Sequence, residues 1–137
     1  MLAGSFCLAA CDPREQLSGP IFNEAWIRPI PPGMKMTAGF GKLHNPDDTA
    51  IVFNSFSSPS FGEVSLHRTE REDGVSKMRE VPELLVAPGD SIVLEPGGYH
   101  LMLMIPSGDI TPGQTITIAM TAEDGRSFSF EVPVERR

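Results

Sequence analysis

Thiols are absent from almost the whole of this 137-residue sequence, because its two cysteines, Cys7 and Cys11, both lie in the first eleven residues. The rest of the chain therefore cannot form an internal disulfide, a thiolate zinc site or an iron–sulfur cluster. A blue-copper electron-transfer site is excluded as well, since it needs a cysteine thiolate beside two histidines. Any metal bound beyond residue 11 must be held by other side chains.

Basic charge and long apolar runs are also scarce. The sequence has 11 Lys and Arg against 18 Asp and Glu, a net charge of −7, so we expect no nucleic-acid partner, because phosphate binding needs a basic surface. No apolar run approaches the roughly 20 residues of a membrane-spanning helix. No phosphate-binding glycine loop and no nucleophile with a base partner stand out as motifs, so we do not predict an enzyme.

Helical periodicity is missing too, and 13 Pro and 13 Gly divide the chain into short apolar segments separated by turns. This pattern predicts an all-β domain over residues 20–137 and is typical of a β-sandwich or barrel, of which we expect a Greek-key β-sandwich. The expected hairpins join 64–69 to 75–81, 91–94 to 99–105, and 114–122 to 127–134. The other expected strands are 21–28, 36–43 and 50–56.

The N-terminal segment has features of an export signal. Residues 1–11 are apolar and end in Leu8-Ala9-Ala10-Cys11, which resembles the bacterial lipobox, where the cysteine becomes lipidated. The apolar stretch is short and has no Lys or Arg ahead of it, so an ordinary export signal and an apolar tail without a targeting role stay open. We predict that residues 1–19 are a signal or lipoprotein-type segment and tether, with a membrane anchor through lipidated Cys11 as one outcome.

The segment 99–105, YHLMLMI, carries the first group of candidate ligands. Alternate side chains of a strand share a face, so Tyr99, Leu101, Leu103 and Ile105 are expected to face the core. His100 and Met102 then lie together on the other face, with Met104 next to them. An imidazole and a thioether two residues apart are about 6.6 Å apart along a strand, close enough to converge on one ion.

The predicted hairpin 64–81 supplies a second pair. Val64 and Leu66 are expected to point inward, which places His67 on the opposite face. Met78 lies across the turn, within reach of His67 if the two strands pair. Two imidazoles and two thioethers form a soft to borderline ligand set, and thioethers suit Cu(I) while they are poor ligands for Zn, Mg, Ca or Mn.

Each of these residues also has an ordinary explanation. A methionine is usually core filler, and a lone histidine is usually structural. A metal-free exported sandwich that binds a protein partner through its His/Met face therefore stays open as a rival. Met104 could serve as an alternate thioether and Met34 and Met36 could line a path for copper, but packing roles are the simpler interpretation of all three.

The ordered series His67, ten residues, Met78, twenty-one residues, His100, one residue, Met102 resembles the motif of the periplasmic PCu(A)C copper chaperone family. Surrounding segments that also resemble this family are Ala25-Trp26-Ile27-Arg28, Pro31-Pro32-Gly33, Leu43-His44-Asn45-Pro46, Glu72-Asp73-Gly74-Val75, Met78-Arg79 and Pro96-Gly97-Gly98-Tyr99-His100.

The resemblance spans about residues 21 to 134. It implies a cupredoxin-like β-sandwich in the periplasm, or anchored to the inner membrane as a lipoprotein. It also implies that His67, Met78, His100 and Met102 bind Cu(I), with Cu(II) left open. The implied partners are a copper ion and a cytochrome c oxidase subunit or its assembly factors, which would receive the copper.

Overall fold

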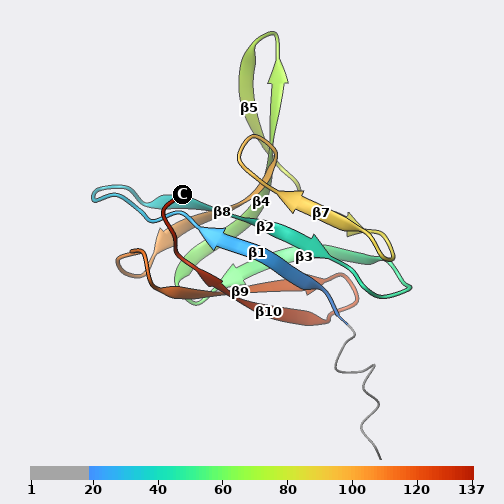
Figure 1. Cartoon of the computed structure of the whole chain (residues 1–137). Coiled ribbons are helices and arrows are strands. Elements are labelled where there is room, and N and C mark those ends of the chain that lie inside the picture. The colour runs from blue at the N-terminus through green and yellow to red at the C-terminus, as the bar shows by residue number, and fades with distance from the viewer. Residues whose placement is uncertain (1–18) are drawn as a thin grey trace, which may run out of the picture.

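The computed structural model describes residues 19–137, so the predictions for Cys7 and Cys11 lie outside its range (Figure 1). The regular elements of this range are ten β-strands, which confirms the all-β prediction. No helix in the described range is long and apolar enough to cross a membrane. The strands are β1 (Ile21–Ile27), β2 (Met36–His44), β3 (Ile51–Ser58), β4 (Phe61–Glu72), β5 (Val75–Glu80), β6 (Leu84–Val86), β7 (Ser91–Leu94), β8 (Tyr99–Pro106), β9 (Thr115–Ala122) and β10 (Ser127–Pro133).

All ten strands belong to one hydrogen-bonded sheet, in the order β1-β2-β7-β8-β4-β3-β9-β10, with β5 added to β4 and β6 added to β3. The sheet folds over on itself, so that β9 and β10 lie beneath β1 and β2 in Figure 1. A parallel bridge between Ile27 and Val134 joins its two ends. The result is a nearly closed barrel with a single apolar core cluster.

Strand alternation places the core as predicted. Ile116, Ile118 and Met120 of β9 are all buried, and Leu101 and Leu103 of β8 are buried in the same cluster. Fully burying an aliphatic side chain of this size contributes about 1.5–3 kcal/mol. A one-residue slip of either strand would turn these side chains to solvent, so core burial fixes which face each residue occupies.

Ile105 departs from the predicted alternation. It was expected to face the core beside Leu103, but its side chain is 62% exposed and its φ is +58°. The left-handed backbone conformation turns the end of β8, and the side chain then lies beside Gly62, where a Cβ would come within 3.0 Å of it. Alternation therefore stops one residue before the strand does.

The predicted hairpin between residues 91–94 and 99–105 is also wrong. Both segments pair antiparallel with β2, β7 with Gly41–His44 and β8 with Met36–Gly39, so they run in the same direction. They share only one parallel pair, Leu94 with Tyr99. The segment 95–98 turns as its glycines indicate, but it is a loop between two consecutive partners of β2, because β2 is long enough to pair with both.

The other two predicted hairpins are confirmed. The β4–β5 hairpin projects from the barrel (Figure 1), and all six residues of β5 are exposed. Asp73 and Gly74 have positive φ at its turn, as a tight hairpin turn requires. The short strand β6 was not predicted, because three residues are too few to show alternation.

The side chain of Asn45 holds the loop after β2 to the barrel. It is fully buried, and its amide donates hydrogen bonds to the carbonyls of Thr49 (2.9 Å) and Val86 (3.1 Å) while its oxygen accepts one from the Asp47 N–H (3.0 Å). Asn45→Ala leaves these buried groups unpaired and should lower the free energy of unfolding by about 1–3 kcal/mol. Urea denaturation measures the change, and exposed Asn54→Ala is the control. Equal stability of the two variants would contradict this role.

Candidate metal centre

The two predicted histidine ligands face each other across neighbouring strands. His67 of β4 is the direct cross-strand partner of His100 of β8. Their rings lie nearly parallel, with 6.0 Å between centroids and 23° between planes. The pairing of β4 with β8 thus brings together two imidazoles that are 33 positions apart in the sequence.

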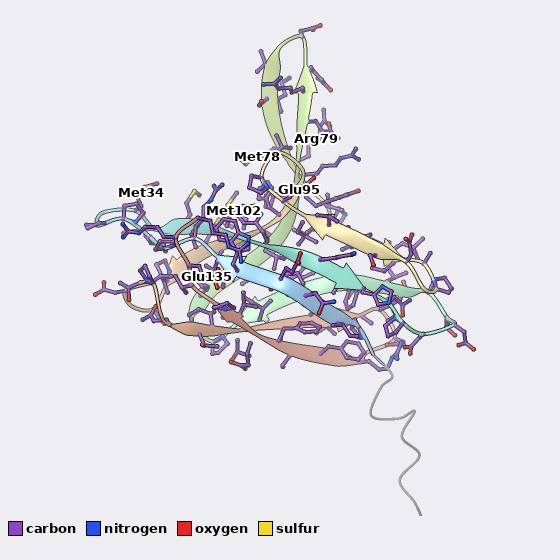
Figure 2. The ribbon with its side chains drawn as sticks, viewed as in Figure 1. Met34, Met78, Arg79, Glu95, Met102 and Glu135 are labelled. Carbon is purple, nitrogen blue, oxygen red and sulfur yellow. The ribbon has the colours of Figure 1, made fainter. Side chains whose placement is uncertain are left out.

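The two methionines lie on the same face of the sheet. Met102 follows His100 by two residues on β8, and Met78 of β5 pairs with Thr69 of β4, two residues beyond His67. Cross-strand partners and alternate residues share a face. Figure 2 shows Met78 and Met102 on the side from which the β4–β5 hairpin rises.

A surface hollow of about 430 Å³ opens on this face. Met78, His100 and Met102 line it, whereas His67 stacks on His100 without lining it. The structure therefore brings three of the four predicted ligands to one hollow and places the fourth in contact with one of them. The remaining side of the hollow is made by Arg28, Phe40, Met34, Met36 and residues of the loops around 29–31 and 96–97.

His100 has an unsatisfied nitrogen. The ring is only 4% exposed, and its Nδ1 lies 3.2 Å from the Gly98 carbonyl oxygen. A carbonyl only accepts, so Nδ1 carries the hydrogen and Nε2 keeps a lone pair. Of the side-chain nitrogens and oxygens described by the structure, Nε2 is the one that is buried without a hydrogen-bond partner. Burying such an atom without a partner costs about 1–3 kcal/mol of folding stability, which a ligand bound to it would restore.

The surroundings keep His100 neutral. Burial lowers its pKa below 6.5, and the positive charge of Arg28 and the nearby His67 ring lower it further, while the Gly98 hydrogen bond acts in the opposite direction. A neutral imidazole is the form that binds a metal. The lone pair on Nε2 is therefore available at neutral pH.

His67 is oriented by a different contact. Its Nε2 lies 2.8 Å from the hydroxyl of Ser65, two residues earlier on the same face of β4. Ser65 is also the cross-strand partner of Met102. One hydroxyl thus sits between an imidazole and a thioether of the predicted set. Sequence patterns gave no indication of this role for Ser65, because it depends on the β4–β8 register.

An aromatic and cationic cluster flanks the hollow. The Arg28 guanidinium lies 4.9 Å from the Phe40 ring centroid and 5.9 Å from that of Trp26. Trp26 is buried outside the main core cluster, with Phe40, Arg28 and Arg137 beside its ring. Alternation of residues 36, 38 and 40 along one strand could have predicted that Phe40 is on the same face of the sheet as the ligands.

The remaining histidine and methionines differ in whether they line the hollow. His44 lies just before a turn, where a surface position is expected, but it is half-buried with its Nδ1 2.7 Å from the Ser91 hydroxyl. Met104 pairs with Met36 across β8 and β2 and is not among the residues lining the hollow. Met34 and Met36 do line it.

The sequence of this chain is similar to those of several known proteins. The family model described as "Putative lipoprotein LpqE-like" matches residues 21–134. A relative from Leifsonia xyli subsp. xyli, "Putative lipoprotein Lxx21020", is 33% identical over 129 residues, covering 93% of this chain and 76% of its own length. "Uncharacterized protein RP573" from Rickettsia prowazekii is 26% identical and covers 82% of this chain and 65% of its own length.

Similar solved structures include PCuAC domains. The copper-bound PCuAC domain from PmoF2 has a TM-score of 0.70 at 17% identity and covers 86% of this chain and 93% of its own. The solution structure of CuI-DR1885 from Deinococcus radiodurans has a TM-score of 0.69 at 26% identity, covering 85% and 78%. The cupredoxin-like fold implied by the sequence motif is therefore confirmed.

The lowered pKa of His100 predicts how the stability of the metal-free chain depends on pH. At pH values near 6.5 and somewhat below, the unfolded chain binds a proton at this ring that the folded chain does not, so the free energy of unfolding falls as the pH drops. The loss begins as the pH falls through about 6.5 and is complete below the folded-state pKa. Urea denaturation at about pH 7.5 and 5.5, with a copper chelator present, measures this loss of stability. In His100→Asn the free energy of unfolding should depend less on pH. The same pH dependence in both proteins would contradict a depressed His100 pKa.

Proposed function

This chain belongs to the LpqE-like family, and we propose on that premise that its folded domain is a copper chaperone that binds one Cu(I) ion. The proposed ligands are His67, Met78, His100 and Met102. The observation that carries the proposal is the buried, unpartnered Nε2 of His100 in the wall of a hollow that the thioethers of Met78 and Met102 also line. A soft cation in this hollow would supply the partner that the lone pair lacks.

The donor atoms select the metal. Imidazole nitrogen binds several transition metals, but thioether sulfur favours Cu(I) over zinc and over hard cations. All four donors are neutral, so the bound site would keep the single positive charge of the ion. Cu(II) is less well matched, because it prefers nitrogen and oxygen donors in a tetragonal arrangement.

The position of the ligands suits transfer more than storage. His100 is buried and anchored to Gly98, whereas Met78 is 61% exposed on the projecting hairpin. An acceptor protein could replace the exposed thioether first, while the anchored imidazole still holds the ion. His67 would first have to coordinate through Nδ1 or release Nε2 from Ser65.

Delivery and location follow from the same premise. The family description and one relative, both named as lipoproteins, support an exported chain anchored at a membrane. In this proposal Cys11 is the site of lipidation and residues 20–137 are the copper-binding domain. We place it in the periplasm or at the outer face of the inner membrane. The spaced motif supports a cytochrome c oxidase subunit or an assembly factor as acceptor, and a binding rather than an enzymatic role.

Removing both thioethers tests the proposal. The full chain should take up one equivalent of Cu(I) in competition with a colorimetric chelator. Met78→Leu/Met102→Leu should lower the affinity by at least about tenfold for each sulfur removed, or about 1.4 kcal/mol apiece. Leucine preserves the volume and apolar character of methionine, so the loss reports on sulfur rather than on packing.

Met104→Leu is the matched control, because Met104 is on the same strand but does not line the hollow. This variant should bind Cu(I) like the wild type. Equal affinity of the wild type and the double variant would contradict the proposal. It would favour instead a metal-free domain whose His/Met face contacts a protein.

A further inference from the structure

The methionines of this chain are distributed in an unusual way. Six lie within residues 19–137, and only Met120 is in the core. Four others line the hollow of the metal centre: Met34, Met36, Met78 and Met102. Methionine is ordinarily a core residue, yet Met34 and Met36 are 54% and 45% exposed. Two of these four thioethers are thus not used by the proposed ligand set.

The β2–β8 register places Met36 next to the ligands. Ala38 pairs with Met102 and Met36 pairs with Met104. Met36 is therefore on the same face of the sheet as Met102, diagonally across from it on the neighbouring strand. Along β8, Met102 therefore stands between His100 and the position of Met36. Ala38, the cross-strand partner of Met102, also lines the hollow.

Met34 reaches the same hollow from a turn. The Met34 N–H donates a hydrogen bond to the Pro31 carbonyl at 3.2 Å. Gly33 has a φ of +88°, a backbone conformation that residues with a side chain rarely adopt. Pro31 and Pro32 restrict the backbone just before this turn. Figure 2 shows Met34 on the same side of the sheet as Met102 and Met78.

We propose that Met34 and Met36 form an outer Cu(I) site made of thioethers alone, through which the ion enters and leaves the His/Met set. This inference rests on the proposed function of the inner site. The ion would be exchanged by ligand substitution, in which one Cu–S bond to Met36 or Met34 breaks as one to Met102 forms. Copper stays Cu(I) and no proton or electron is transferred.

The ligands and charge of the outer site favour transit over storage. Lys35 lies between the two methionines in sequence. Its positive charge repels a cation, although its exposure weakens the effect at physiological salt. Two thioethers without an imidazole, next to Lys35, should therefore bind Cu(I) more weakly than the inner imidazole-containing set, as a transfer position requires.

Methionine methyl NMR can follow both sites separately. The full chain with ¹³C-labelled methionine methyl groups is titrated anaerobically with Cu(I), and again with Ag(I) as a redox-inert substitute. The first equivalent should shift the Met78 and Met102 signals. Further metal should shift Met34 and Met36, while the core Met120 stays in place.

Met34→Leu/Met36→Leu supplies the functional test, with Met104→Leu as control. The double variant should keep the first equivalent but transfer Cu(I) to a small chelator at least about tenfold more slowly than wild type or control. An unchanged transfer rate, or Met34 and Met36 signals that do not move with excess metal, would overturn the outer site. Failure of the first equivalent to shift Met78 and Met102 would instead overturn the proposed function of the inner site.

Discussion

The antiparallel register of β4 and β8 is the constraint on which the metal centre depends. It sets His67 opposite His100 and, one residue away, Leu66 opposite Leu101. Both leucines are buried in the core, so alternation directs both imidazoles to the outer face. A slip by one residue would expose the leucines, at about 1.5–3 kcal/mol each, and turn the histidines into the apolar core. The apolar core therefore holds the proposed ligands in place without any metal.

The metal centre combines rigid and accessible parts. The barrel carries His67, His100 and Met102, with His100 anchored by the Gly98 carbonyl of the loop between β7 and β8. The projecting hairpin carries Met78, which is largely exposed. Leaving Nε2 of His100 without a partner costs stability in the metal-free chain, and binding of a cation would recover that cost. This is the arrangement expected of a site preorganised for a ligand.

Much of this could be predicted from residue order alone. The period-2 pattern of 99–105 assigned Leu101 and Leu103 to the core and His100 and Met102 to the other face, as the structure has them. What the pattern could not provide was the pairing of distant strands, which makes β7 and β8 consecutive partners of β2 and places Ser65 opposite Met102. The exposed turn at Ile105 and the placement of Met34 and Met36 in the hollow depend on backbone geometry that alternation does not encode.

X-ray absorption at the copper edge of the full chain loaded with one equivalent of Cu(I) tests the central claim most directly. Sulfur scatters differently from nitrogen and oxygen, so the spectrum separates thioether ligands from nitrogen or oxygen ligands. A mixed set of two imidazoles and two thioethers predicts both nitrogen and sulfur in the first coordination shell, with the multiple scattering of imidazole rings. A shell with only nitrogen and oxygen, or sulfur without imidazole, would contradict the account.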